Sequence, residues 1–341
     1  MAMLNILLVK TSSMGDLIHN MPVIADIRAH HPDAVIDWVT EDSFAEIAAL
    51  NPRIDQRIIV SMRRWKKQLF STATWRAFFA FRQRLRQRPY DAILDTQGLL
   101  KSALICHWAH GPSHGADRHT AREAIAGRVY DHAHDIPKDL HAVTRNRLVA
   151  AKALGYSLDT LPLRYELKVP DTALPFAISK HIVPVFHGTA RAAKLWPVEH
   201  WIALGVTMQQ HGLQILLPWG SEVERLRAVK IAEAVPAAIV PPRMRLSQLA
   251  ALIQQAPLTI GLDTGLMHLA VALDIPTLAI FCDTHIWQAG ALPAASGKAV
   301  TIGGKGITPS PDEAWQALQS LCEMPDRARS QAHHPSDRSS A

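Results

Sequence analysis

Two polar segments of this chain carry residue types suited to acid–base chemistry and anion binding. Asp263–Gly265 follows a short apolar run and precedes a helical pattern over residues 266–273, which Asp274 and Pro276 end. Lys10–Asp16 follows a similar apolar run and precedes another helical pattern. Each segment predicts a strand that turns into a helix, where the free N–H groups of the first turn favour a phosphate.

A purely structural role is the alternative for both carboxylates. Asp is common at helix starts, where its oxygens accept hydrogen bonds from backbone N–H groups. Asp16 and Asp263 would then be helix caps, and His268 would be a packed helix residue. For an isolated Asp-Thr-Gly segment this interpretation stands beside the functional one.

The surrounding pattern alternates strands with helices. Strands are predicted in the first half at Leu4–Val9, Ala34–Val39, Arg57–Val60 and Tyr90–Asp95. Strands are predicted in the second half at Ile182–Phe186, Leu213–Leu217, Ala238–Val240, Leu258–Leu262, Thr277–Phe281 and Ala299–Ile302. We therefore predict an α/β protein with two Rossmann-like parallel-sheet domains in tandem. The carboxyl ends of both sheets would face a central cleft, where ligands of such folds bind.

A segment with two prolines, residues 169–175, is the predicted domain linker. It divides the chain into an N-terminal domain, 1–170, and a C-terminal domain, 171–322, followed by a disordered tail, 323–341. The predicted helices include Leu17 to about Arg28, Val198–Gln210, Leu246–Gln255 and Pro311–Cys322. The last of these is free to pack back on the N-terminal domain.

Composition excludes several classes of protein. The chain has 341 residues with 48% hydrophobic and 19% charged residues, and none of its apolar runs approaches the ~18 residues of a membrane span. The start of the chain lacks a signal-peptide pattern, and Cys106, Cys282 and Cys322 are too few and too widely spaced for a disulfide framework. We therefore expect a cytoplasmic protein. A dinucleotide fingerprint, a P-loop and zinc-ligand spacing are all missing, so no metal site is predicted.

The net charge of +6 lies entirely in residues 1–170, because residues 171–341 contain as many acidic as basic residues. Residues 63–88 are especially basic, with interleaved Trp and Phe and no acidic residue. Three interpretations compete for this stretch: a solvated helix face, a nucleic-acid patch, or a surface for anionic lipid. The aromatic residues favour lipid, and nucleic acid is disfavoured because no recognised binding module surrounds the stretch.

Two further polar loops follow strands in the second half, at residues 187–197 and 217–224. Lys194 can place a positive charge on a phosphate, Thr189 can donate a hydroxyl hydrogen bond, and Glu224 can accept from ribose hydroxyls. The structural alternatives are a surface lysine, a capping threonine and a first-turn glutamate. The combination with Asp263–Gly265 favours a sugar-nucleotide pocket.

Four ordered motifs, Lys10–Asp16, Lys194–Pro197, Leu217–Gly220 and Asp263–His268, resemble those of the bacterial ADP-heptose:lipopolysaccharide heptosyltransferases, glycosyltransferase family 9. The resemblance extends from about Leu4 to Cys322 and is strongest to members that add the first heptose of the inner core. It implies the GT-B fold, an ADP-L-glycero-β-D-manno-heptose donor in the C-terminal domain and a Kdo-lipid A acceptor in the N-terminal domain. It also implies a monomer on the cytoplasmic face of the anionic inner membrane.

The resemblance also implies roles for individual residues. Asp16 matches the catalytic base of an inverting transfer that requires no metal or cofactor, with ADP-heptose as co-substrate. The implied donor-site residues are Thr189, Lys194, Glu224, Met244, Asp263, Thr264, Gly265 and His268. The implied acceptor-site residues are Lys10, Arg63, Arg64, Lys101, Arg122 and His141.

The sequence departs from the family pattern at two places. Ala190 stands where a second threonine is frequent, and residues 281–285 lack the usual Gly-x-Thr-x-Pro form. The runner-up functions are a later heptosyltransferase or another GT-B sugar transferase, then a nucleotide-sugar epimerase. A basic nucleic-acid-binding protein is the non-enzyme alternative.

Overall fold

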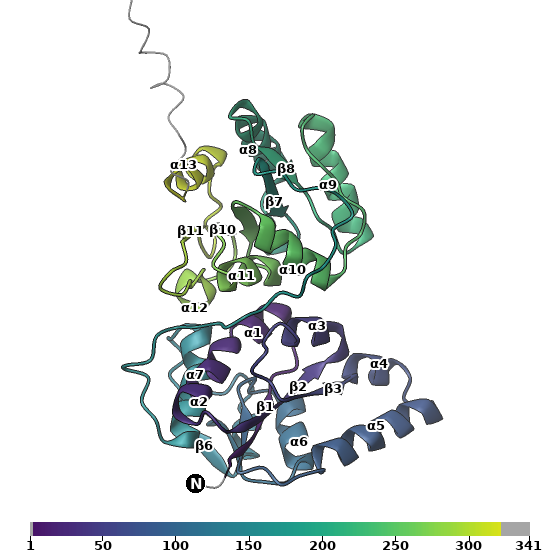
Figure 1. Ribbon diagram of the computed structural model, residues 1–341, viewed down its shortest axis with the longest axis vertical. Helices are drawn as coiled ribbons and strands as arrows, with labels where there is room; N and C mark the ends of the chain where they lie inside the picture. The colour runs from purple at the N-terminus through teal and green to yellow at the C-terminus, as the bar shows by residue number, and fades with distance from the viewer. Residues whose placement is uncertain (1–2, 322–341) are drawn as a thin grey trace, which may run out of the picture.

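The structure is a computed structural model that describes residues 3–321, so the expected tail, 323–341, and Cys322 lie outside the described residues. The chain folds into two α/β domains, and the N-terminal domain is the lower one in Figure 1. Each domain contains one parallel sheet with helices packed on it. None of the helices within residues 3–321 is long and apolar enough to cross a membrane.

The N-terminal sheet has the strand order β3-β2-β1-β4-β5-β6, which is the order of the dinucleotide-binding Rossmann fold. Its strands are β1 Asn5–Val9, β2 Val35–Glu41, β3 Gln56–Val60, β4 Ala92–Asp95, β5 Ser113–Ala116 and β6 His132–His134. Successive residues of β1 point to opposite faces, so Ile6 and Leu8 join one buried cluster while Leu7 and Val9 join another. Burial on both faces explains why β1 is a continuous apolar run.

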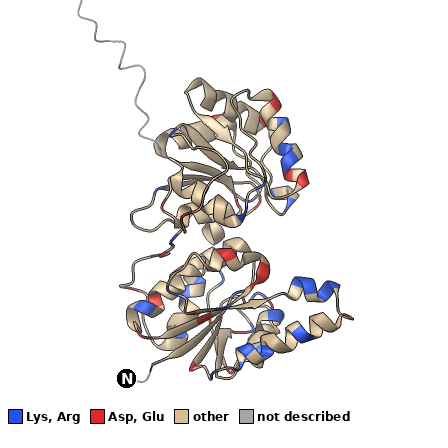
Figure 2. Ribbon diagram, turned by 45° about the vertical axis from the view of Figure 1, so that its right-hand side comes forward, with Lys and Arg blue, Asp and Glu red and all other residues tan. Residues whose placement is uncertain are grey.

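The helices of this domain connect its parallel strands and cover the sheet (Figure 1). They are α1 Met14–Ile18, α2 Met21–His30, α3 Ala45–Ala48, α4 Met62–Lys67, α5 Thr72–Leu85, α6 Leu100–Trp108 and α7 Ala142–Leu154. Short 3₁₀ turns lie at Asp42–Phe44 and Ala126–Arg128. The pair α4 and α5 projects sideways from the body of the domain, and Figure 2 shows Lys and Arg along both helices.

The C-terminal sheet has the order β11-β10-β9-β7-β8, again with every pair parallel. Its strands are β7 Ile182–Phe186, β8 Gln214–Leu216, β9 Thr259–Leu262, β10 Thr277–Phe281 and β11 Ala299–Gly303. Its helical segments are a 3₁₀ turn at Ala192–Lys194, α8 Val198–Gln210, α9 Glu222–Ala234, α10 Leu246–Gln255, α11 Gly265–Ala272, α12 Ile286–Ala289 and α13 Pro311–Leu321.

Capping boxes begin two of the C-terminal helices. The Glu224 carboxylate accepts the Ser221 N–H at 3.1 Å, and Ser221 Oγ accepts the Glu224 N–H at 3.3 Å. The pair Ser310 and Glu313 repeats this exchange before α13, at 2.7 and 3.2 Å. Both follow the Ser-x-x-Glu pattern, which fixes where these helices start.

The two domains share buried apolar contacts. One cluster joins residues of the N-terminal core, such as Ile18 and Ile47, to Ala250 and Leu269 of the C-terminal domain. The helices that meet across the boundary are α1 with α11 and α3 with α10. The first turns of α1 and α11 are thereby brought face to face.

Several elements differ from their predicted form. The predicted helix from Leu17 divides into α1 and α2, because Pro22 has no N–H and begins a new helix after Asn20. Strands β5 and β6 have no apolar run and were not predicted, and residues 238–240 form only a single bridge, at Ile239. The segment between Gly155 and His181 has neither helix nor strand, so the connection is longer than residues 169–175.

The last helix also differs from expectation. Helix α13 packs against α8, β10 and β11 of the C-terminal domain. The expectation that it packs back on the N-terminal domain is therefore wrong. Ala314 and Leu318 are fully buried in the C-terminal core, which gives the apolar face of α13 its partner. This packing leaves the helix far from the lower domain in Figure 1.

Candidate active site

A cavity of about 890 Å³ lies between the two domains at the carboxyl ends of their strands. This volume is within the range of about 300–1,000 Å³ that is usual for small-molecule sites. The lining combines the loop after β1, the loop after β4 and α7 with the loops after β7, β9 and β10. The predicted cleft between facing sheets is therefore present.

Asp16 lies in the first turn of α1, just after β1. Its Oδ2 accepts hydrogen bonds from the Ser13 N–H at 2.8 Å and from the Ser13 hydroxyl at 3.1 Å. The Arg122 guanidinium lies 3.6 Å from the same oxygen, and within residues 3–321 Oδ1 makes no such contact. Asp16 thus caps its helix through one oxygen, while its side chain stays 28% exposed to the cavity.

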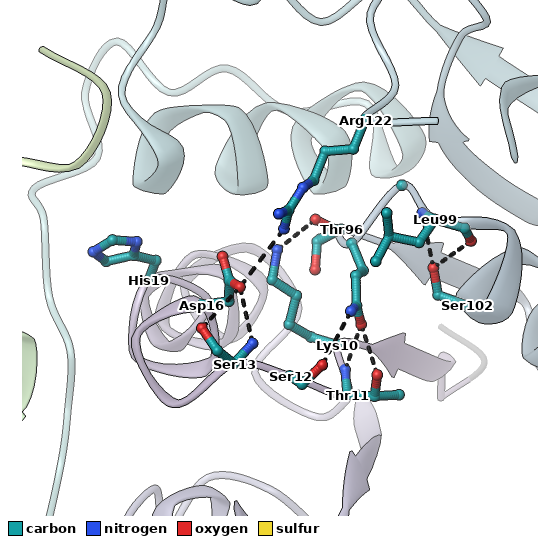
Figure 3. Close-up of polar contacts among 12 residues, drawn as sticks. Lys10, Thr11, Ser12, Ser13, Asp16, His19, Thr96, Leu99, Ser102 and Arg122 are labelled. Atoms are coloured by element: carbon teal, nitrogen blue, oxygen red, sulfur yellow. Dashed lines mark hydrogen bonds and ion pairs between the residues drawn. The ribbon is translucent and has the colours of Figure 1, made fainter. Parts of the chain in front are cut away.

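Two cations set the ionisation of Asp16. Figure 3 shows Lys10 and Arg122 side by side next to its carboxylate, with the Lys10 ammonium donating to the Thr96 carbonyl at 2.6 Å. Burial lowers the pKa of Lys10 to about 8, so the ammonium stays mostly protonated at neutral pH. Burial acts to raise the pKa of Asp16, but Lys10, the Ser13 N–H and Arg122 outweigh it and lower the pKa overall. Asp16 is therefore ionised at neutral pH.

The loop that carries Lys10 is held by the loop after β4. Gln97 Oε1 accepts the Thr11 N–H at 2.7 Å and the Thr11 hydroxyl at 2.8 Å. Asp95 is buried and accepts the Gln97 N–H and the Tyr130 hydroxyl, each at 2.7 Å. These hydrogen bonds fix the segment on which the position of Asp16 depends.

Asp263 directly follows β9 and is enclosed by partners. Its Oδ2 pairs with the Lys194 ammonium and accepts the Thr284 hydroxyl at 2.6 Å, while Oδ1 lies 3.5 Å from His268 Nε2. Thr189 donates to the Asp263 backbone carbonyl at 3.2 Å. Burial acts to raise the pKa of this carboxyl, but the His268, Lys194 and Thr284 contacts hold it below its usual range.

The first turn of α11 faces the first turn of α1 across the domain boundary. Thr264 occupies the N-cap position without a capping hydrogen bond from its side chain. A Cβ on Gly265 would lie 2.6 Å from Met14 Cγ, and one on Gly15 would lie 3.0 Å from His268 Cδ2. The two helix starts therefore touch through glycines, and the uncapped N–H groups of α11 suit an anion.

Three histidines lie where the domains meet. His19 Nε2 and His268 Nδ1 are 3.2 Å apart, so one ring donates a hydrogen bond to the other. The other nitrogen of His268, Nε2, lies 3.5 Å from Asp263 Oδ1. Burial, with the neighbouring His268, lowers the pKa of His19 well below its usual value and keeps its ring neutral. His141 Nε2 donates to the Gly290 carbonyl at 3.1 Å. Hydrogen bonds thus connect the two halves of the site.

A model of the family described as Glycosyltransferase family 9 (heptosyltransferase) matches residues 78–314. The chain belongs to this family. Lipopolysaccharide heptosyltransferase 1 of Pseudomonas aeruginosa is 40% identical over 294 residues, covering 84% of this chain and 81% of that protein. The same-named protein of Escherichia coli strain K12 is 39% identical over 293 residues, covering 82% of this chain and 88% of that one.

Solved structures of a heptosyltransferase match this fold as well. E. coli heptosyltransferase WaaC with ADP superposes with a TM-score of 0.83 at 34% identity, covering 94% of this chain and all of that chain. The same enzyme with ADP-2-deoxy-2-fluoro heptose gives 0.80. The resemblance expected from four motifs and the two-domain GT-B fold are thereby confirmed. The family 9 chain is a heptosyl-transferring glycosyltransferase active in lipopolysaccharide core biosynthesis.

The cavity brings together most of the residues that the sequence singled out. Those lining it are Lys10, Asp16, Arg63, Arg122, Thr189, Lys194, Asp263, Thr264, Gly265 and His268. Arg63 reaches the lining from α4, with its guanidinium 5.2 Å above the Phe44 ring.

Five predicted residues lie outside this lining. The Glu224 carboxylate accepts the Gly220 and Ser221 N–H groups, and Met244 is buried in an apolar cluster. Arg64 donates to the Ser61 hydroxyl, Lys101 to the Ser12 hydroxyl, and His141 to the other domain.

Several lining residues were not predicted from the sequence. The loop at Asp95–Gly98 follows a predicted strand, so the rule applied to the other strand ends would have found it. Thr284 lies in the segment that departs from the family pattern, yet it contacts Asp263. Arg145 and Asn146 enter the cavity from α7, near the end of the predicted N-terminal domain, and no local sequence signal marks them.

Proposed function

We propose that this family 9 enzyme transfers L-glycero-D-manno-heptose from ADP-heptose to the Kdo of Kdo-lipid A, which adds the first heptose of the inner core. The observation that carries the proposal is a single cavity in which the ionised Asp16 of one domain faces the Lys194–Asp263 pair of the other. Sequence similarity supports transfer of the first heptose and not of a later one. Heptosyltransferase 1 proteins reach 40% identity to this chain, whereas heptosyltransferase 3 of E. coli K12 reaches 25%.

The donor would bind to the C-terminal domain. Lys194 and the N–H groups at the start of α11 would hold the diphosphate, and Asp263 would accept hydrogen bonds from heptose hydroxyls. Thr189 and His268 hold Asp263 in place. Glu224 and Met244 do not line the cavity. Glu224 lies next to Gly188 and Met244 lies in an apolar cluster, and we propose that both shape the ribose and adenine end of the donor site.

The acceptor would bind to the N-terminal domain. Lys10, Arg63 and Arg122 line its side of the cavity and would pair with the Kdo carboxylate and with phosphates. Lys101 and Arg64 lie beside this wall, where they would extend the cationic surface, and His141 would hold the domains together.

The proposed step is a single displacement with inversion. A Kdo hydroxyl oxygen bonds to the anomeric carbon of heptose, the bond from that carbon to the ADP oxygen breaks, and Asp16 takes the hydroxyl proton. Negative charge that gathers on the diphosphate is met by Lys194 and the α11 amides, so the step is written without a metal. The lowered pKa of Asp16 means that the base is already deprotonated at neutral pH.

We also propose that the enzyme works on the cytoplasmic, anionic face of the inner membrane. The support is the basic pair of helices α4 and α5, along which Figure 2 shows Lys and Arg. Phe70, in the turn between them, and Phe79, on α5, are exposed. Replacing Arg63, Arg64, Lys66 and Lys67 by Ser should weaken sedimentation with phosphatidylglycerol vesicles, and the loss should shrink as salt rises. Unchanged vesicle binding would contradict the membrane role.

Acceptor-dependent ADP release tests the proposed reaction directly. ADP-heptose is incubated with Kdo-lipid A, with the heptosylated product, or alone. Release only with Kdo-lipid A is expected. Release only with the heptosylated acceptor would indicate a later heptosyltransferase, and a new sugar from donor alone would indicate an epimerase.

A further inference from the structure

A second cavity, of about 560 Å³, lies between α4, α5 and α6 on the outer side of the N-terminal domain. It is called the α4–α6 pocket below. Its wall is mainly apolar and aromatic, formed by Met62, Trp65, Leu69, Trp75, Phe78, Leu99, Leu100 and Leu104. Leu69, Trp75 and Leu104 remain 55, 51 and 39% exposed, which is unusual for large apolar side chains that already lie close together. The volume is that of a ligand site.

The rim of the pocket carries charge. Lys66 and Lys101 line it together with one carboxylate, Glu123, which is engaged by the Leu100 N–H at 2.7 Å. Arg63, Arg64 and Lys67 flank Lys66 on the same short helix, so the cations outnumber the acid. An apolar interior below a cationic rim is complementary to an anionic amphiphile, with its chain inside and its phosphates at the rim.

The α4–α6 pocket is a neighbour of the acceptor side of the active-site cavity, with no lining residue in common. Lys101 donates to the Ser12 hydroxyl at 3.0 Å, and Ser12 belongs to the loop that leads to Asp16. Arg122 lines the active-site cavity while its neighbour Glu123 lines the pocket. Likewise, Met62 lines the pocket and its neighbour Arg63 lines the active-site cavity. The two cavities therefore lie side by side on the N-terminal domain, on the two sides of residues 62–63 and 122–123.

We propose that the α4–α6 pocket holds a fatty acyl chain of the acceptor lipid whose Kdo lies at Asp16. This rests on the proposed acceptor, and it adds a recognition element for the lipid end. The chain would replace water on the faces of Trp75 and Leu104, and the phosphates next to it would pair with Lys66 and Lys101. Acylation of the acceptor would then contribute to its binding, while the chemistry at Asp16 would be unaffected.

The test compares Kdo-lipid A in detergent micelles with the same acceptor after complete deacylation. Leu104→Gln places a polar group in the wall without filling the pocket, and Leu69→Gln does the same from the turn between α4 and α5. Each should raise KM for the acylated acceptor by about tenfold, since burial of an apolar side chain is lost. KM for the deacylated acceptor and kcat for both should stay unchanged. Leu226→Gln, at a 56% exposed position on α9, is the matched control.

Four outcomes would overturn the inference. An equal rise in KM for both acceptors would show that the substitutions disturb the sugar site. No rise for either would show that the pocket does not take the chain. Weaker sedimentation of Leu104→Gln with acceptor-free phosphatidylglycerol vesicles, matching the rise in KM, would identify bilayer lipid as the occupant. If the unsubstituted enzyme transferred to neither acceptor, the proposed function itself would fail, and the inference with it.

Discussion

Asp16 and Asp263 occupy equivalent places in their domains, yet their surroundings differ. Asp16 lies in the first turn of α1, after the loop that follows β1, and Asp263 directly follows β9, one residue before the N-cap of α11. Asp16 is 28% exposed and keeps one oxygen open, with its nearest full charge 3.6 Å away. Asp263 is 10% exposed, and Lys194, Thr284 and His268 together occupy both of its oxygens.

The difference separates two kinds of carboxylate chemistry. An acid that accepts a proton needs an oxygen that a substrate hydroxyl can reach. An acid that orients a ligand or a lysine gains from being held rigidly by neighbours. Asp16 fits the first description and Asp263 the second, although their sequence contexts look alike. Four substitutions test this contrast, in order of decreasing effect.

Asp16→Asn should reduce turnover by roughly 10²–10⁴-fold, the usual contribution of a general base. Asn can still accept the Ser13 N–H, so the start of α1 should be preserved. Acceptor-dependent ADP release measures the turnover, and calorimetry should give unchanged affinity for ADP-heptose. Near-normal turnover would remove Asp16 from the chemistry.

Lys194→Gln should lower kcat/KM by roughly 10²-fold, because it removes the cation that we propose stabilises the departing diphosphate. Affinity for ADP should fall as well, which distinguishes this variant from Asp16→Asn. Lys230→Gln, a 64% exposed position on α9 of the same domain, is the control and should behave as wild type. Tight ADP binding by Lys194→Gln would contradict the assignment.

Arg122→Gln should shift the pH profile. Arg122 helps to lower the pKa of Asp16, so its removal raises that pKa, and the base becomes protonated at a higher pH. The loss of activity on the acid side should therefore occur at a higher pH than in the wild type, which moves the acid limb of the kcat/KM profile to higher pH. An unmoved acid limb with raised KM would leave Arg122 a role in acceptor binding only.

Thr284→Val should have the smallest effect. It removes one hydrogen bond to Asp263 and leaves the Lys194 and His268 contacts, so a loss of about 0.5–1.5 kcal/mol in donor affinity is expected. Titration with ADP-heptose and with ADP measures it. A larger loss for ADP-heptose than for ADP would place the effect at the sugar, whereas equal losses would place it at the phosphates.

The local sequence pattern was enough to predict part of the fold and of the candidate site. The β9–α11 turn, the β1–α1 turn and the helices α8 and α10 were predicted because apolar spacing and stop residues mark them. Strands β5 and β6 were missed because His114, His132 and His134 dominate them and pairing with neighbours, not apolar runs, makes them strands. The partners of each carboxylate could not be predicted, since Arg122 and Thr284 approach from loops far along the chain.

The contact between Gly15 and Gly265 has a consequence for how the enzyme can change. The distance between donor and acceptor domains is fixed at this point by missing side chains, so a single methyl group there would act as a wedge. Gly265→Ala would have to push Met14 aside or open the cleft. The reach from sugar to hydroxyl would therefore change through one small residue that takes no part in the proposed chemistry through a side chain.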